Sequence, residues 1–138
     1  MKAKGIISLV VALLLAGVCV ASDEGTAPAE KAAASWLALT DSGSYSQSWE
    51  QAAQVFKAAV TKEQWAQALS TARASLGKVV SRKMKSATYT TTLPGAPDGQ
   101  YVVIQYETSF ENKAAAVETV TPMLEKDGQW HVSGYYIH

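Results

Sequence analysis

Apolar residues recur every three or four positions between residues 30 and 76, the spacing that gathers them on one face of an α-helix. Polar turns divide this region into three expected helices. The first ends in the turn Asp41-Ser42-Gly43-Ser44. Its apolar face comprises Ala33, Trp36, Leu37 and Thr40. The pattern therefore predicts amphipathic helices that each bury one side.

The second and third expected helices begin alike, with a hydroxyl residue three positions before a glutamine. Ser44 and Gln47 have this spacing, and so do Thr61 and Gln64. It is the spacing of a capping box, in which two side chains bond free backbone groups at a helix start. Gly77 then ends the third helix, because glycine adopts a left-handed conformation at low cost. The two apolar stripes are Trp49, Ala52, Ala53, Phe56 and Val60, and Trp65, Ala68, Leu69, Ala72 and Leu76.

From residue 79 onward, β-forming residues replace the helical period. The segment 93–99 holds two prolines and two glycines and predicts a turn, and Lys126-Asp127-Gly128 predicts a tight hairpin. Pro122 indicates an edge or a bulge. The expected strands cover residues 79–92, 100–110, 115–125 and 129–137. Residues 30–138 are therefore predicted to form one α+β domain, with three N-terminal helices packed on one face of a four-stranded antiparallel sheet.

Side-chain alternation indicates which residues of the strands face the helices. The more apolar side of the second strand comprises Val102, Ile104, Tyr106 and Phe110. In the last strand, Trp130, Val132 and Tyr136 share one side, and the other side holds His131, Ser133 and Tyr135. We expect the first set of each strand to pack against Trp36, Trp49 and Trp65.

The four tryptophans have two interpretations. As core residues, each could bury about 150–250 Å². As an exposed platform, they could stack on a carbohydrate ring, but such a platform needs polar side chains around it. The sequence does not place such side chains beside them, so it favours core packing.

Residues 1–21 have the layout of a secretory signal peptide. Lys2 and Lys4 precede an apolar run, and Cys19-Val20-Ala21 supplies small residues where a signal peptidase cleaves. Residues 22–29 are small and acidic and are expected to form a disordered lead. Cleavage predicts an exported protein, periplasmic in a double-membraned bacterium, without cysteine and hence without a disulfide.

A second interpretation concerns Cys19 itself. Leu15-Ala16-Gly17-Val18-Cys19 approaches the signal of a bacterial lipoprotein, although Val18 is branched where a small residue is usual. A lipid on Cys19 would anchor the protein to a membrane and turn the lead into a tether.

The charge balance and the histidine content exclude several function classes. The chain has 12 basic and 12 acidic residues, and loss of Lys2 and Lys4 leaves a formal charge of about −2. Nucleic acid is therefore not an expected partner. His131 and His138 do not have the spacing of a metal pair, and neither a nucleophile elbow nor a phosphate loop occurs. We expect no metal and no cofactor.

The sequence favours a non-enzymatic binding or interaction module of the cell envelope. The alternative is a small-ligand-binding or catalytic cavity domain, for which the candidate residues are Asp41, Tyr45, Arg82 and Tyr106. If Arg82 faces the helices, its buried charge needs a partner such as Asp41 or Glu50. In a binding module that pair would be a structural ion pair, and in a cavity domain it would contact the ligand.

The uncovered face of the sheet is a candidate interface. Parity places four apolar residues there, namely Tyr101, Val103, Tyr135 and Ile137. A contiguous patch of this kind would serve a homodimer or an envelope protein partner.

The chain resembles the family of small exported bacterial proteins known as domain of unknown function 4019. The residues that carry the resemblance include Trp36-Leu37, Ser48-Trp49, Leu76-Gly77, Leu93-Pro94-Gly95, Asp98-Gly99-x-Tyr101 and Asp127-Gly128-x-Trp130-x-Val132-x-Gly134-Tyr135-Tyr136-Ile137. The resemblance implies a fold and no activity. The order of helices before the sheet and the final Trp-x-Val strand also resemble the broader cone-shaped α+β class of nuclear transport factor 2 and cystatin-like domains.

Overall fold

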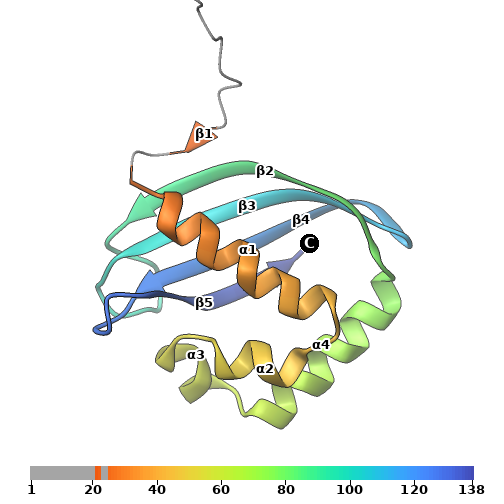
Figure 1. Ribbon diagram of the computed structural model, residues 1–138, viewed down its shortest axis with the longest axis horizontal. Coiled ribbons are helices and arrows are strands. Elements are labelled where there is room, and N and C mark those ends of the chain that lie inside the picture. The colour runs from red at the N-terminus through yellow and green to blue at the C-terminus, as the bar shows by residue number, and fades with distance from the viewer. Residues whose placement is uncertain (1–20, 23–24) are drawn as a thin grey trace, which may run out of the picture.

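The computed structural model describes residues 21–22 and 25–138. Within these residues the chain forms four helices and five strands (Figure 1). The helices are α1 (Ala27–Asp41), α2 (Tyr45–Glu50), α3 (Gln54–Ala59) and α4 (Lys62–Leu76). The strands are β1 (Ala21–Ser22), β2 (Val79–Thr90), β3 (Tyr101–Phe110), β4 (Lys113–Leu124) and β5 (Trp130–Ile137).

The described strands form one sheet in the order β1-β2-β3-β4-β5. Strands β2 to β5 are an antiparallel meander, and the two residues of β1 pair in parallel with the outer edge of β2. Helix α1 crosses one face of the sheet, and α2, α3 and α4 lie beside it toward β5 (Figure 1). The expected α+β architecture, with helices on one face of an antiparallel sheet, is confirmed.

The N-terminal expectations meet the structure only in part. Residues 1–20 of the expected signal peptide lie outside the described residues. Helix α1 begins at Ala27, inside the segment 22–29 that we expected as a lead. Within the described residues, no helix is both long and apolar enough to cross a membrane.

The second expected helix is divided into α2 and α3. The chain turns at residues 51–53 because the backbone N–H of Ala53 leaves the helical ladder and donates to Val132 O of β5 at 2.8 Å. Ala52 and Ala53 are both buried at this docking point. The helical pattern of the sequence continues through these residues, because alanine favours a helix and does not indicate where one ends.

One of the two expected capping boxes is present. Thr61 and Gln64 each bond the other's backbone N–H through the side chain, both at 3.1 Å. Ser44 makes no cap bond from its side chain. Its hydroxyl lies 3.1 Å from the hydroxyl of Ser42 instead.

The core lies between α1 and the middle of the sheet. Its buried residues are Ala29, Ala33, Trp36, Leu37, Ala87, Val102, Ile104, Tyr106, Val120 and Val132. The expected apolar face of α1 and the inward side of β3 are thus confirmed. Trp65 and Trp130 pack against this core, whereas Trp49 is half-buried beneath Lys57 and Lys62, each 5.7 Å from its ring.

The parity that we predicted for the last strand is wrong beyond Val132. Pro122 pairs with Val132 but Thr121 pairs with Gly134, so Ser133 is an extra residue in a bulge. The bulge reverses the alternation. Tyr135 therefore faces the helices, with its ring 5.2 Å from that of Trp36, and Tyr136 is 69 % exposed.

Gly77, which ends α4, predicts a specific loss of stability. Its φ is 76°, and an added Cβ would lie 2.9 Å from Cβ of Glu111. Gly77→Ala should therefore lower the free energy of unfolding by about 1–3 kcal/mol in chemical denaturation. Gly43→Ala is the control, because Gly43 has a φ of 79° but open space around it. Equal losses in the two variants would contradict the predicted clash.

Candidate functional site

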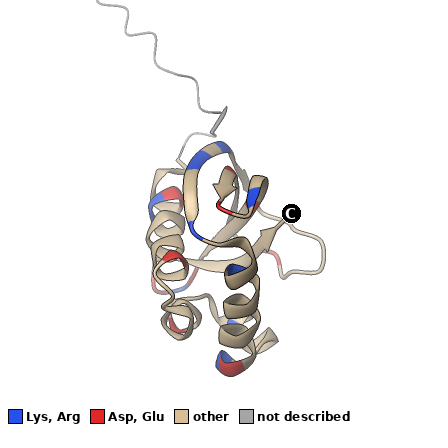
Figure 2. Cartoon of the chain, turned by 90° about the vertical axis from the view of Figure 1, so that its right-hand side faces the viewer, with Lys and Arg blue, Asp and Glu red and all other residues tan. Residues whose placement is uncertain are grey.

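Charged side chains converge where the C-terminal end of α1 and helix α4 meet the sheet. Six residues from six elements form this charged network. They are Asp41 of α1, Arg73 of α4, Arg82 of β2, Thr108 of β3, Glu118 of β4 and Tyr135 of β5. The two arginines and two carboxylates balance in charge, while elsewhere the charged residues are scattered over the helices and strands (Figure 2).

Arg82 joins the two carboxylates. Its Nη1 and Nη2 donate to the two carboxylate oxygens of Asp41 at 2.7 and 3.0 Å. Its Nε and Nη2 donate to Glu118 at 2.7 and 3.2 Å. A planar guanidinium matches carboxylates in this two-pronged geometry, which a lysine could not reproduce.

Arg73 reaches the same carboxylates from α4. Its side chain is 6 % exposed, and Nη2 donates to Asp41 Oδ1 at 2.8 Å and to the hydroxyl of Thr40 at 2.9 Å. The guanidinium also lies over the ring of Phe110, 5.1 Å from its centroid. Its Nε is buried and has no hydrogen-bond partner within the described residues.

Glu118 is the most deeply buried charge of the network, with a fully buried side chain. In addition to the bonds from Arg82, it accepts hydrogen bonds from the hydroxyl of Thr108 at 2.5 Å and from the hydroxyl of Tyr135. Arg73 Nη2 lies 3.7 Å from its Oε2. A buried carboxylate keeps its charge only when such partners replace water.

The network shifts the pKa values of Asp41 and Arg82 in the directions that keep both side chains charged. Burial raises the pKa of the Asp41 carboxyl, but the hydrogen bonds and charges of Arg82 and Arg73 outweigh it and hold this pKa below its usual range. Burial opposes the charge on Arg82, yet Asp41 and Glu118 raise its pKa. Burial and the charge of Glu118 raise the pKa of Tyr135, so its hydroxyl remains a donor.

The structure brings together two of the four candidate ligand residues. Asp41 and Arg82 form the pair that sequence reasoning named first, whereas Glu50 pairs with Lys62 at 2.6 Å. Tyr45 lines an open groove of about 750 Å³ with Asp41 and Arg73. Tyr45 thus lies at the rim of the network.

Tyr106 lies next to the network, because it is the cross-strand neighbour of Glu118. It is 6 % exposed, and its hydroxyl is buried without a hydrogen-bond partner within the described residues. Burial, with smaller contributions from surrounding charges, raises the pKa of Tyr106 to about 12. The phenol is therefore neutral and enclosed at physiological pH.

Sequence reasoning missed Arg73 and Glu118. The sequence could have indicated both, because each charged residue stands at a position that the periodicity of its helix or strand assigns to the buried face. Arg73 lies four residues after Leu69, the buried residue of the α4 stripe. Glu118 alternates with the buried Ala116 and Val120 along β4. An inward charge on two elements predicts that the two charges pair.

The four residues of the expected interface do not share one face. Tyr135 lies on the helix-covered side, and Ile137 lines a small hollow with Trp65 and Leu69 of α4. Tyr101 is 1 % exposed, and its hydroxyl donates to Pro97 O at 2.6 Å, within the turn that precedes β3. The interface itself remains a prediction.

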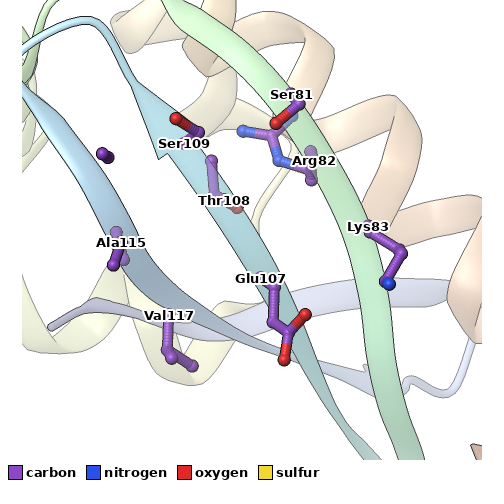
Figure 3. Close-up of a pocket in the computed structure, with 10 residues that line it drawn as sticks. Ser81, Arg82, Lys83, Glu107, Thr108, Ser109, Ala115 and Val117 are labelled. Carbon is purple, nitrogen blue, oxygen red and sulfur yellow. The ribbon is translucent and has the colours of Figure 1, made fainter.

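The uncovered face of the sheet carries a shallow groove of about 590 Å³ near the ends of β2, β3 and β4 (Figure 3). Figure 3 shows Lys83 and Glu107 side by side on neighbouring strands, as their register requires. The remaining lining is mostly small, with Ser81, Ser109 and Ala115. Arg82 and Thr108 also line this groove, but both are bonded to Glu118 in the charged network.

His131 fixes the hairpin between β4 and β5 to the end of α2. Its Nδ1 lies 3.1 Å from Gln51 O, and its Nε2 lies 2.9 Å from Asp127 Oδ2 and 3.8 Å from Glu125 Oε1. Burial lowers the pKa of His131, but the bonds to Asp127 and to Gln51 O, with the charges of Asp127 and Glu125, give a net raised pKa. Within the described residues, no three His, Cys, Asp or Glu side chains group as metal ligands would.

The buried carboxylate of Glu118 should be worth far more to stability than an exposed pair. Glu118→Ala leaves Arg73 and Arg82 without half of their counter-charge, and we expect it to lower the free energy of unfolding by about 3–5 kcal/mol. Glu50→Ala breaks only the exposed pair with Lys62 and should cost far less. Denaturant titration measures both, and similar losses would contradict a structural network.

The raised pKa of His131 predicts how stability depends on pH. Its stabilising contribution is complete below the pKa of the unfolded histidine and is lost as pH rises through the folded pKa. The free energy of unfolding should therefore fall between about pH 6 and pH 8. His131→Gln and Asp127→Asn should both flatten this fall, and an unchanged pH profile in both variants would show that the contact contributes nothing.

Comparison with known proteins places the chain in a family but assigns the charged network no role. Among curated proteins, none matches the chain. The family described as "protein of unknown function (DUF4019)" matches residues 32–135. This range contains every residue of the charged network and well over half of the chain. The chain therefore belongs to this family of proteins of unknown function.

Proposed function

We propose that the protein is an exported, non-enzymatic binding module of the bacterial cell envelope. The proposal has two parts, export and binding, which rest on different parts of the chain. Export rests on residues 1–21, whose basic start, apolar run and small residues before position 22 are the features that a signal peptidase recognises.

Binding rests on one observation: the buried carboxylates and guanidinium groups of the interior pair with one another. A general acid or base must reach a substrate proton within hydrogen-bond distance. Both carboxylate oxygens of Asp41 accept from guanidinium groups, and those of Glu118 accept from Arg82, Thr108 and Tyr135. This arrangement favours a structural network over a reactive cavity.

Hydrogen-bonding groups that a partner could reach lie at the surface. The uncovered sheet face presents hydroxyl and amide side chains such as Thr88, Gln105 and Thr119. Tyr136 adds an exposed aromatic ring to that face. A second copy of the chain or another envelope component could be recognised there without chemical change.

The export half of the proposal is tested by the mass of the protein recovered from fractionated cells. We expect a periplasmic protein whose first residue is Ser22. A protein that begins at a diacylated Cys19 would also be exported, but as a membrane-anchored lipoprotein. A cytoplasmic protein that keeps Lys2 and Lys4 would contradict export.

Tyr106 and Tyr135 form a matched pair that tests whether the interior is structural. Tyr106→Phe removes a hydroxyl without a partner in the described residues, so the free energy of unfolding should stay within about 0.5 kcal/mol or rise. Tyr135→Phe removes a donor to Glu118 and should cost about 1–3 kcal/mol. If Tyr106→Phe costs as much as Tyr135→Phe, the Tyr106 hydroxyl has a partner and the cavity alternative regains support.

A further inference from the structure

A groove separates α1 and α2 from the start of β5. It has a volume of about 490 Å³, and its lining includes Ser35, Gln47, Gln51, Gln129 and Trp130. A second hollow of about 470 Å³ continues it along α1 and shares Ala32, Ser35, Gln129 and Trp130. Together they form an extended groove of the size that holds small ligands.

Three amide side chains of this groove are free to bind a ligand. Gln47, Gln51 and Gln129 are exposed, and within the described part of the chain their amide groups make no hydrogen bond. Each amide offers two donors and one acceptor. These three glutamines come from two distant segments, and the fold places them on one groove.

Trp130 differs from the other three tryptophans. Trp36, Trp49 and Trp65 donate their indole N–H groups to Ser48 O, Val60 O and the Ser48 hydroxyl at 2.8–2.9 Å. The indole N–H of Trp130 has no such partner within the described residues. Trp130 is half-buried, packs against the core and lines both parts of the groove. It therefore offers an aromatic surface together with a free donor.

The walls of the groove are fixed before any ligand binds. Ala53 N–H donates to Val132 O, His131 bonds Gln51 O, and Trp36 donates to Ser48 O. These contacts hold α1, α2 and β5 in one arrangement. A preformed groove reduces the ordering cost that weak ligands must meet.

The chemistry of the lining favours an uncharged ligand that is dense in hydroxyl groups. His131 is the one titratable residue that lines the 490 Å³ part, and both its ring nitrogens are engaged by Asp127 and Gln51 O. Lys31 lines only the adjoining hollow. A proline-rich peptide would need several exposed aromatic rings. The lining offers a single one, because Trp36 is 3 % exposed.

We propose that this groove binds a short stretch of a neutral polysaccharide, with a sugar ring against Trp130 and its hydroxyl or acetamido groups on the three glutamines. The inference deepens the proposed function and rests on it, because export would bring the groove to the glycans of the envelope. Of the four tryptophans, Trp130 is thus the one that serves as a carbohydrate platform, because the fold places Gln47 and Gln51 beside it in addition to its sequence neighbour Gln129.

The test is a nuclear magnetic resonance titration of the protein purified from cells. The probes are the tetramer of N-acetylglucosamine and maltotetraose. We expect one of them to shift the indole resonance of Trp130 and the side-chain amide resonances of Gln47, Gln51 and Gln129. Absence of shifts with both probes, or shifts confined to another surface, would overturn the inference.

Variants on exposed positions keep the test independent of folding. Gln51→Ala and Gln129→Ala should each weaken binding about five- to tenfold, as loss of one hydrogen-bonding group predicts. Gln67→Ala, an exposed glutamine of α4 outside the groove, should leave the affinity unchanged. Equal affinities in all three variants would overturn the assignment of the groove.

A proline-rich hexapeptide separates failure of this inference from failure of the proposed function. Shifts at Trp130 with the peptide and none with the sugars would overturn the saccharide class and retain a binding module. The mass of the N-terminus tests export separately, so a cytoplasmic protein would contradict the proposed function whatever the titration shows.

Discussion

The buried carboxylate of Glu118 constrains how every layer of this protein can pack. It points from β4 toward the helices with a fully buried side chain, so its charge must be met inside the fold. Arg82 from β2 and Arg73 from α4 meet it, and Asp41 at the end of α1 completes the balance. These ion pairs tie α4 and the C-terminal end of α1 to the sheet.

The residue pattern predicted the elements better than it predicted their faces. The stripe of α1, the capping box at Thr61 and the stop at Gly77 are local features, and the structure contains each of them. The break at residues 51–53 was not predictable, because it depends on a hydrogen bond to Val132, which lies far away in the sequence. The bulge at Ser133 reversed two tyrosines for the same reason, since register with β4 is a tertiary property.

The candidate site was likewise predictable where it depends on local sequence and not where it depends on tertiary contacts. Asp41 and Arg82 could be paired from sequence, because an inward arginine needs an acid and a turn placed one nearby. Arg73 and Glu118 carried the same signal within a helical stripe and a strand. The groove beside Trp130 had no sequence signal, because its glutamines at positions 47, 51 and 129 converge only through the docking of α2 on β5. An interior whose charges pair with one another leaves recognition to the surface.

The most direct test of this account is an experimental structure of the protein purified from its own cell envelope, with any molecule that remains bound. We expect Arg73 and Arg82 to contact Asp41 and Glu118 in that structure, and a retained molecule to lie in the groove beside Trp130. A small molecule in contact with Asp41, Arg82 or the hydroxyl of Tyr106 would contradict this expectation and make the interior the functional site.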